Sequence, residues 1–179
     1  QEFSNYVGAP MMDGLAFVHN MLVGFGIRQH IKVIASGKIL SGFHILRAMA
    51  LGADGCNSAR AMMMALGCIQ ALLCNTNRCP TGITTQDPQL TVGLVVEDKK
   101  HRVANYHEDT VKSFVELLGA AGLEDMKQLT RSHIYRRVFM NEVRTFEDVF
   151  PSLQPGCLLN GNIPEKYKQD IEAASVDRW

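Results

Sequence analysis

The sequence lacks an excess of charge of either sign. Its 18 Lys and Arg residues balance its 18 Asp and Glu residues, so the formal net charge is zero. Nucleic-acid-binding domains usually carry a clustered basic surface, and helices that lie on membranes are usually basic on their polar face. The charge balance therefore argues against both classes, and we expect no nucleic-acid partner.

Long apolar runs are also missing. Gly, Arg or Asn interrupts every run well short of the roughly 18 residues that a transmembrane helix needs. The first ten residues, QEFSNYVGAP, contain neither the basic nor the apolar segment of a secretory signal. We therefore expect a cytoplasmic protein, with any membrane anchor lying upstream of residue 1.

A disulfide framework is not indicated either. Five cysteines are an odd number, and without a secretory signal they favour reduced thiols in the cytosol. Nine methionines, three of them in the run 62–64, would be a liability in an oxidising compartment. With 46% hydrophobic and 20% charged residues, the remaining composition is that of an ordinary globular protein of one domain or slightly more.

Strands and helices are expected to alternate in the first part of the chain. The patterns predict helices over 13–24, 42–52 and 59–73, and short buried strands over 31–35 and 53–57. Such alternation is typical of a parallel sheet with right-handed crossovers. Two parallel strands do not make a stable sheet, so we expect the later part of a larger α/β fold.

The pattern changes after Pro80. A polar loop is expected over 81–90, an amphipathic helix over 103–120 and a pair of helices within 123–150. The charged run 97–102 reads as a solvated helix start. A proline- and glycine-rich segment begins at Pro151 and leads into a last helix. We therefore divide the chain into an α/β part, 1–100, and a helical extension, 101–179.

Small residues fill the turn after each predicted strand. The turns are ASGK, residues 35–38, and GCNSAR, residues 55–60. Such turns let backbone N–H groups approach an anion closely, and a following helix N-terminus adds positive potential. With Lys38 and Arg60 nearby, the two turns could form one phosphate pocket, as the loops after strands 7 and 8 often do in (β/α)8 barrels. Plain turn chemistry is the alternative.

Three thiols are crowded into the segment GCIQALLCNTNRCPTG. Cys68, Cys74 and Cys79 have the spacing C-x5-C-x4-C, and Pro80 follows. Structural zinc prefers four ligands in closely spaced pairs, and a disulfide would leave one thiol over. Three thiolates can hold a three-iron cluster, or a four-iron cluster with one open iron. Zinc remains an alternative, as do inert buried thiols, which is the interpretation that suits Cys56 and Cys157.

A long stretch carries a family resemblance. IKVIASGKILSGFHILRAMALGADGCNSARAMMMALGCIQALLCNTNRCPTGITTQDP closely resembles the FMN-binding synthase domain of glutamate synthase, especially its stand-alone, glutaminase-less type. The resemblance continues through RVANYHEDTV and LTRSHIYRRV. It implies the C-terminal part of a (β/α)8 barrel, in which the two strands are strands 7 and 8. Residues 1–100 would then end the FMN-binding barrel, cluster loop included, and 101–179 would pack on it as a helical extension.

The resemblance also implies cofactors and partners. It assigns FMN phosphate to Ser36, Gly37, Lys38, Asn57, Ser58, Ala59 and Arg60, and a [3Fe-4S] cluster to Cys68, Cys74 and Cys79. The implied reaction is reductive amination of 2-oxoglutarate with ammonia to glutamate, by hydride from FMN. The implied partners are an electron donor, such as ferredoxin or a reductase subunit, and the missing N-terminal part of the barrel. The chain alone would be an inactive fragment, and no catalytic residue is assigned within it.

Other readings stay open. A related amination, such as N-methylglutamate synthesis, could use the same scaffold, and a non-catalytic fragment could dock on a partner chain. Several polar residues are expected to have structural roles only. We expect helix-surface or packing roles for His19 and His44, local hydrogen bonds for Asn20 and Asp54, and solvent-facing side chains for Arg131, Arg136 and Arg137.

Overall fold

Two parallel strands, each followed by a helix, organise the first part of the chain. The computed structural model describes residues 7–174, in which the predicted α-β-α-β-α order is confirmed. The strands pair in parallel with Ser36 opposite Asn57. The elements are α2 (Met11–Gly24), β1 (Ile34–Ser36), α3 (Gly42–Ala50), β2 (Gly55–Asn57) and α4 (Ala59–Ala65).

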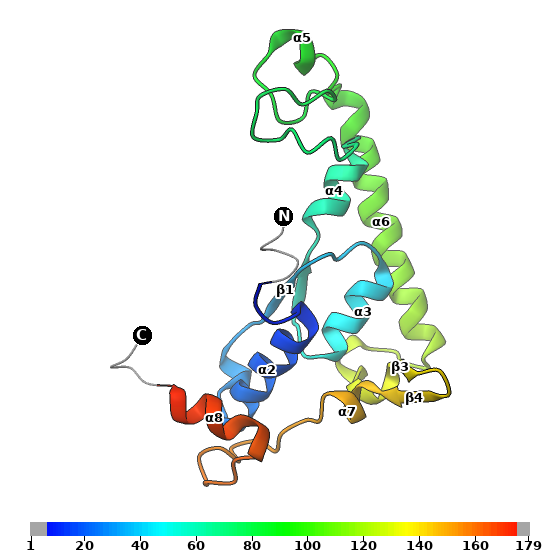
Figure 1. Ribbon diagram of the computed structural model, residues 1–179. Helices are drawn as coiled ribbons and strands as arrows, with labels where there is room; N and C mark the ends of the chain where they lie inside the picture. The colour runs from blue at the N-terminus through cyan, green and yellow to red at the C-terminus, as the bar shows by residue number, and fades with distance from the viewer. Residues whose placement is uncertain (1–6, 175–179) are drawn as a thin grey trace.

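The second part contains helices, one hairpin and irregular segments. It contains α5 (Pro88–Thr91), α6 (Val96–Ala120), two 3-10 turns (Met126–Gln128 and Arg131–His133), β3 (Tyr135–Phe139), β4 (Glu142–Thr145), α7 (Phe146–Val149) and α8 (Glu165–Ala173). A further 3-10 turn, Arg28–His30, precedes β1. Figure 1 shows α6 running beside α4 and α3, from the loop that carries α5 toward the hairpin. No helix within residues 7–174 is both long and apolar enough to cross a membrane.

Helix α4 ends eight residues before the predicted position. It stops at Ala65 because Gly67 takes a positive φ of 102°, which suits glycine. The N–H groups of Gly67 and Cys68 then bond back to the carbonyls of Met64 and Met63, which closes the helix end. The prediction of a helix through residue 73 is therefore wrong, and residues 66–73 belong to the cysteine loop.

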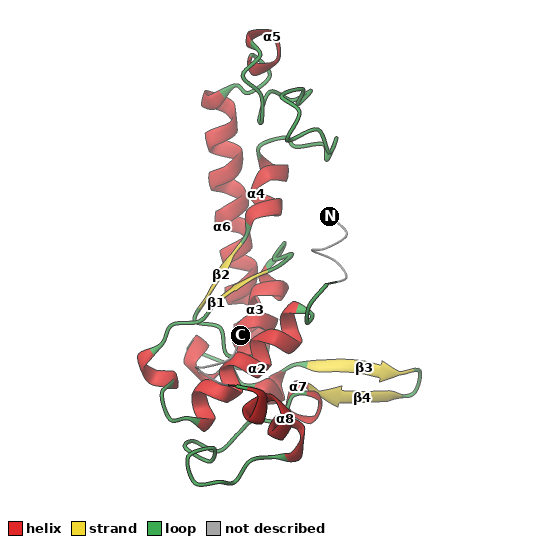
Figure 2. Ribbon diagram, turned by 60° about the vertical axis from the view of Figure 1, so that its left-hand side comes forward, coloured by secondary structure: helices red, strands yellow, loops and turns green. Residues whose placement is uncertain are grey.

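A β-hairpin replaces part of the predicted helical pair. Strands β3 and β4 pair antiparallel, and Figure 2 shows them projecting from the body of the molecule. Neither strand has a fully buried residue, so neither shows the alternation of apolar and polar residues that marks a strand in sequence. The helix expected to end this region is a single turn, α7. Helix α6, by contrast, begins at Val96 and so includes the charged run 97–102.

The buried core is small for the size of the chain. One cluster joins residues of α2, α3, α6 and α7, and many of its members are alanines. The chain exposes 12275 Å² of surface, whereas the size scaling of folded monomers gives roughly 8,600 Å² for 19.8 kDa. Apolar side chains such as Ile34, 62% exposed on β1, account for part of the excess. The fold therefore leaves apolar surface that a self-contained domain would bury.

Arg131 ties the C-terminal segment to α2. Its side chain is 3% exposed and donates to the Phe150 carbonyl and to Oδ1 of Asn20, at 2.9 Å for the latter. Asn20, 1% exposed, donates in turn to the Tyr167 hydroxyl of α8 at 2.8 Å and to the Pro151 carbonyl at 2.9 Å. The prediction of a solvent-facing Arg131 is wrong, as is that of local bonds for Asn20, because both residues serve contacts between distant segments. The exposed Arg136 and Arg137 agree with their prediction.

Arg28 connects the segments that lead into the two parallel strands. Its guanidinium donates to the Gly52 carbonyl and to Oδ2 of Asp54, each at 2.7 Å, and to Nδ1 of His19 at 3.1 Å. Asp54 also accepts from the backbone N–H of Val33 at 2.8 Å. The segments that lead into β1 and β2 are thereby held together, and His19 has the packing role expected from the sequence. The prediction of local bonds for Asp54 is wrong, because its partners Arg28 and Val33 lie on distant segments of the chain.

We predict that Gly52→Ala destabilises the protein. A Cβ at this position would lie 2.0 Å from Nδ1 of His19, which Arg28 holds in place, and the φ of 108° is unfavourable for alanine. The free energy of unfolding should fall by about 2–4 kcal/mol, measured by urea denaturation. Gly55→Ala is the control, because its Cβ would meet no atom within 4 Å. Equal stability of the two variants would contradict the prediction.

Acid should destabilise the fold through His19. Burial first, and then the charges of Arg131 and Arg28, lower its pKa from 6.5 to about 4. Between these values the unfolded chain binds a proton that the folded chain does not, so stability is lost as the pH falls from 6.5 through 4. After allowance for solvent screening, the loss should be about 1–2 kcal/mol.

Urea denaturation of His19→Gln at several pH values tests this contribution. Glutamine stays neutral and can accept from Arg28, so the variant should lose stability less steeply than the unmodified protein between pH 6.5 and 4. His30→Gln, which removes an exposed imidazole, should keep the full pH dependence. An unchanged slope in His19→Gln would assign the acid sensitivity to other groups.

Candidate functional site

The two small-residue turns line one cavity. Because Ser36 pairs with Asn57 at the carboxyl ends of the parallel strands, the segments that follow them lie side by side. A cavity of about 430 Å³ opens there. Six of the seven residues to which the family resemblance assigns phosphate line it, namely Ser36, Gly37, Lys38, Asn57, Ala59 and Arg60. The strand pairing thus brings together turns that lie about twenty residues apart in sequence.

Ser58, the seventh residue, connects the two turns instead of lining the cavity. Its hydroxyl donates to the Ile39 carbonyl at 2.7 Å. Since Ile39 follows the first turn and is itself buried, this bond fixes the second turn against the first. Ser58 is therefore a positioning residue for the cavity wall.

The backbone of the first turn requires a glycine. Gly37 has a φ of 152° and Lys38 a φ of 54°, both in the region that side chains other than glycine rarely adopt. A Cβ on Gly37 would lie 3.1 Å from Cγ of Met11, which also lines the cavity. Non-glycine residues with positive φ cluster at functional sites, and here the strained residue is the lysine beside the cavity.

The three thiols of the cysteine loop lie in different environments. Cys68 follows the end of α4 and is half-buried, Cys74 is exposed, and Cys79 is 9% exposed. All five cysteines of the chain are free. Within residues 7–174, no group of three or more His, Cys, Asp and Glu side chains lies close enough to hold a metal ion. The structure therefore does not gather the three thiols.

Cys79 differs from the other thiols in its chemistry. Its Sγ lies 3.4 Å from the Thr81 hydroxyl. That hydroxyl and the backbone N–H groups of Thr84 and Thr81 stabilise the thiolate and lower the pKa of Cys79 to about 6. Burial, in contrast, raises the pKa of Cys56. Cys79 therefore suits a thiolate ligand, whereas Cys56 behaves as a packing residue.

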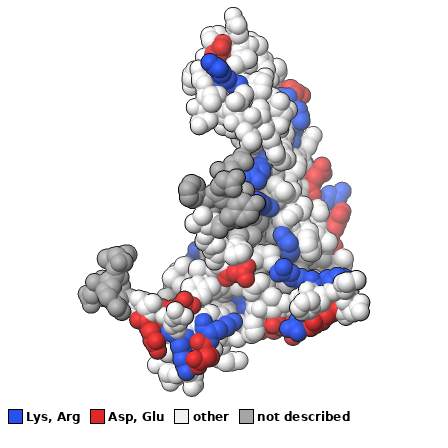
Figure 3. Space-filling model, viewed as in Figure 1, with Lys and Arg blue, Asp and Glu red and all other residues white. Residues whose placement is uncertain are grey.

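Backbone strain and apolar exposure mark the rest of the cysteine loop. Gln70, Leu72 and Asn77 all have positive φ values. Asn77 holds the loop's return segment through bonds from the Thr85 hydroxyl and the Gln86 N–H. Ile69 and Leu72 are more than half exposed, and Figure 3 shows mostly uncharged atoms over this lobe. The loop is therefore ordered by its own contacts while its apolar side chains lack a cover.

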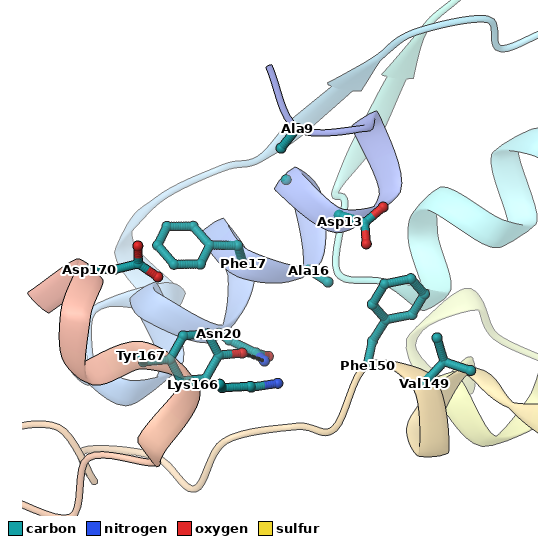
Figure 4. A pocket seen from close by; sticks show the side chains of 11 residues that line it. Ala9, Asp13, Ala16, Phe17, Asn20, Val149, Phe150, Lys166, Tyr167 and Asp170 are labelled. Carbon is teal, nitrogen blue, oxygen red and sulfur yellow. Dashed lines mark hydrogen bonds between the residues drawn. The ribbon is translucent and has the colours of Figure 1, made fainter. Parts of the chain in front are cut away.

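A further cavity lies between α2 and α8. Figure 4 shows Phe17 and Asn20 from α2 facing Tyr167 from α8, with Phe150 closing the other side. The rings of Phe17 and Tyr167 are 5.9 Å apart. The sequence gives no sign of this group, because Asn20 and Tyr167 are 147 residues apart and no local pattern links them. Its hydrogen bonds are those that attach α8, so its role is structural.

The strand pairing and the first cavity define the class of protein: an α/β fold with a small-residue cavity at the carboxyl ends of parallel strands. The conserved region of glutamate synthase matches residues 1–124. The chain belongs to the glutamate synthase family. This confirms the resemblance found in the sequence.

Curated relatives agree with this assignment. The chain is 43% identical over 136 residues to the glutamate synthase large subunit-like protein YerD of Bacillus subtilis. It is 39% identical over 127 residues to the archaeal glutamate synthase (NADPH) of Methanocaldococcus jannaschii. These alignments cover 76% and 71% of this chain, and 26% and 25% of the two relatives. The chain thus spans about a quarter of their length.

A longer relative is matched less closely. Identity to the glutamate synthase (NADH) of Saccharomyces cerevisiae is 28% over 169 residues, which is 92% of this chain and 8% of the relative. The alignment therefore extends beyond residue 124 into the hairpin and the C-terminal segment.

Proposed function

We propose that the chain is the C-terminal part of an FMN-binding (β/α)8 barrel in a glutamate synthase-type oxidoreductase. Strands β1 and β2 would be barrel strands 7 and 8, residues 1–100 the barrel end with its cluster loop, and 101–179 a helical extension. The observation that carries the proposal is the cavity between the two turns, where barrels of this kind hold phosphate groups. Family membership supplies the reaction class: reductive amination of 2-oxoglutarate with ammonia to glutamate.

The cavity wall fits the phosphate of FMN. Lys38 and Arg60 bring two positive charges to it, and Ser36 and Asn57 add polar side chains that can donate to an anion. The φ values of Gly37 and Lys38 turn the backbone sharply at the cavity, as anion-binding turns do. In the complete protein FMN would supply hydride to the substrate. The residues of this chain would hold its phosphate and so fix its position.

The cysteine loop fits a [3Fe-4S] cluster by its donor chemistry but not by its present arrangement. Cys68, Cys74 and Cys79 are free thiols, and the low pKa of Cys79 favours the thiolate that iron requires. The three are not gathered among the described residues. Metal binding is coupled to folding, so a cluster would have to draw the three thiols together as it binds. We therefore assign the cluster to these thiols and derive no geometry for it.

The exposed strand edges support the proposal that further protein segments pack against this chain. Strands β1 and β2 pair only with each other within residues 7–174, which leaves the outer edge of each without a neighbour. We infer that the preceding strands of the barrel cover them. The names of the relatives include NADPH-linked, NADH-linked and ferredoxin-dependent enzymes, so ferredoxin or a reductase subunit is the proposed electron donor. Five free thiols agree with a cytoplasmic location.

Iron analysis tests the cluster assignment. Anaerobically purified protein that contains this chain should hold roughly three irons, with matching acid-labile sulfide, and should give the EPR signal of an oxidised three-iron cluster. Serine replacement of Cys68, Cys74 or Cys79 should each abolish the iron. Cys157→Ser, at a half-buried thiol outside the loop, is the control and should retain it. Bound zinc, or folded protein free of metal, would overturn the assignment.

Flavin titration tests the phosphate cavity. Arg60→Gln should weaken FMN binding about tenfold or more, because a hydrogen bond to a charged group contributes about 1.5–3 kcal/mol. Quenching of flavin fluorescence measures the dissociation constant. Lys112→Gln removes one positive charge from an exposed position on α6 and should leave the constant unchanged. Equal weakening by both variants would point to general electrostatics instead of a site.

A further inference from the structure

A second cavity lies on the other side of the first turn. It has a volume of about 560 Å³ and opens between the start of α2, the helix α3 and the strand β3. The two cavities share a wall of Pro10, Met11, Gly37 and Lys38. His44, Arg47 and Arg136 line the second cavity and not the first. Figure 3 shows Lys and Arg side chains gathered where α3 meets the hairpin.

Arg47 has an unsatisfied polar atom. It lies in the last turn of α3, with its guanidinium carbon 5.4 Å from the centre of the Phe43 ring. Its Nε is buried and has no hydrogen-bond partner within the described part of the chain. A buried donor without a partner costs about 1–3 kcal/mol, and such groups call for an explanation in a native structure.

Arg136 is a second cation without a counter-charge. Its cross-strand neighbour on β4 is Arg144, whose own side chain pairs with Glu142. Across residues 7–174, no carboxylate lies within ion-pair distance of Arg47 or Arg136. Burial and the charge of Arg136 both lower the pKa of Arg47, so the two guanidinium groups interact unfavourably. Asp13 is the one acidic residue among the described residues that line the cavity, and it is exposed.

We propose that this cavity is a second anion site, in which Arg47 and Arg136 bind a small molecule with two or more phosphate or carboxylate groups. Planar guanidinium groups recognise both kinds of anion through paired hydrogen bonds. An anion bound between the two guanidinium groups would remove the repulsion between the two arginines. The two arginines are separate from the proposed flavin-binding residues, because neither lines the first cavity, although the cavities share the wall that contains Gly37 and Lys38. It also gives a binding role to the hairpin, which lies beyond the region 1–124 that defines the family.

Isothermal titration calorimetry of the intact protein tests the proposal, with inorganic pyrophosphate and citrate as separate probes. At least one probe should bind saturably, and the tighter one identifies phosphate or carboxylate as the preferred group. Arg136→Gln and Arg47→Gln should each weaken that binding about tenfold, since charge-assisted bonds are about twice as strong as neutral ones. Arg136 is exposed, so its variant should fold even if Arg47→Gln does not.

Two further variants separate the site from its surroundings. Arg137→Gln removes the next charge along β3, which does not line the cavity and bonds instead to the Met140 carbonyl, so it should leave binding unchanged. In protein saturated with FMN, the first cavity is occupied, so Arg60→Gln, which alters only that cavity, should also have no effect. Binding lost in Arg60→Gln but kept in Arg136→Gln would assign the anion to the flavin turns and overturn the proposal. Equal weakening by Arg137→Gln, or no saturable binding of either probe, would overturn it as well.

Discussion

The parallel pairing of β1 with β2 is the constraint on which the rest of the structure depends. It consists of three residue pairs, from Ile34 with Gly55 to Ser36 with Asn57. So short a sheet has little cohesion of its own, and it is held at both ends by side chains. Arg28 and Asp54 join the segments that enter the strands, and Ser58 joins the turns that leave them. These two sets of contacts keep the register of the strands, and the cavity at the carboxyl ends depends on that register.

Local chemistry explains what the sequence predicts well. A short β-branched run before a glycine turn marks β1, the alternation with helices indicates β2, and the small-residue turns point to six lining residues of the first cavity. A glycine after the last turn also marks the end of α4: Gly67 closes α4 just as Gly52 closes α3. The apolar residues beyond Gly67, however, resemble a continuing helix. Those residues are exposed, so their hydrophobicity reflects a surface without a cover and not a helix interior.

Long-range contacts explain what the sequence does not predict. Arg131 reads as a surface residue because its partners, Asn20 and the Phe150 carbonyl, are brought to it only by the fold. The hairpin gives no period-two signal because neither strand has a buried face. The sequence identifies the three thiols as candidate ligands, but their spacing does not predict the distances between them in the fold. A loop with few buried side chains has no packing to impose the distances that a cluster needs.

The distribution of apolar surface and the family match both support the proposal that the chain is part of a larger fold. Within residues 7–174 the surface is larger than the mass requires, the strand edges are unpaired and the cysteine loop is exposed, which agrees with the proposal that the chain is part of a larger barrel. The side of the molecule near the hairpin is different, because the groups that lack a counter-charge there, among the described residues, are the charged side chains of Arg47 and Arg136. Apolar surface is buried by further protein, whereas paired guanidinium groups are best satisfied by anions. Under the two proposals, the strands would therefore face further protein and the arginines a small anionic molecule.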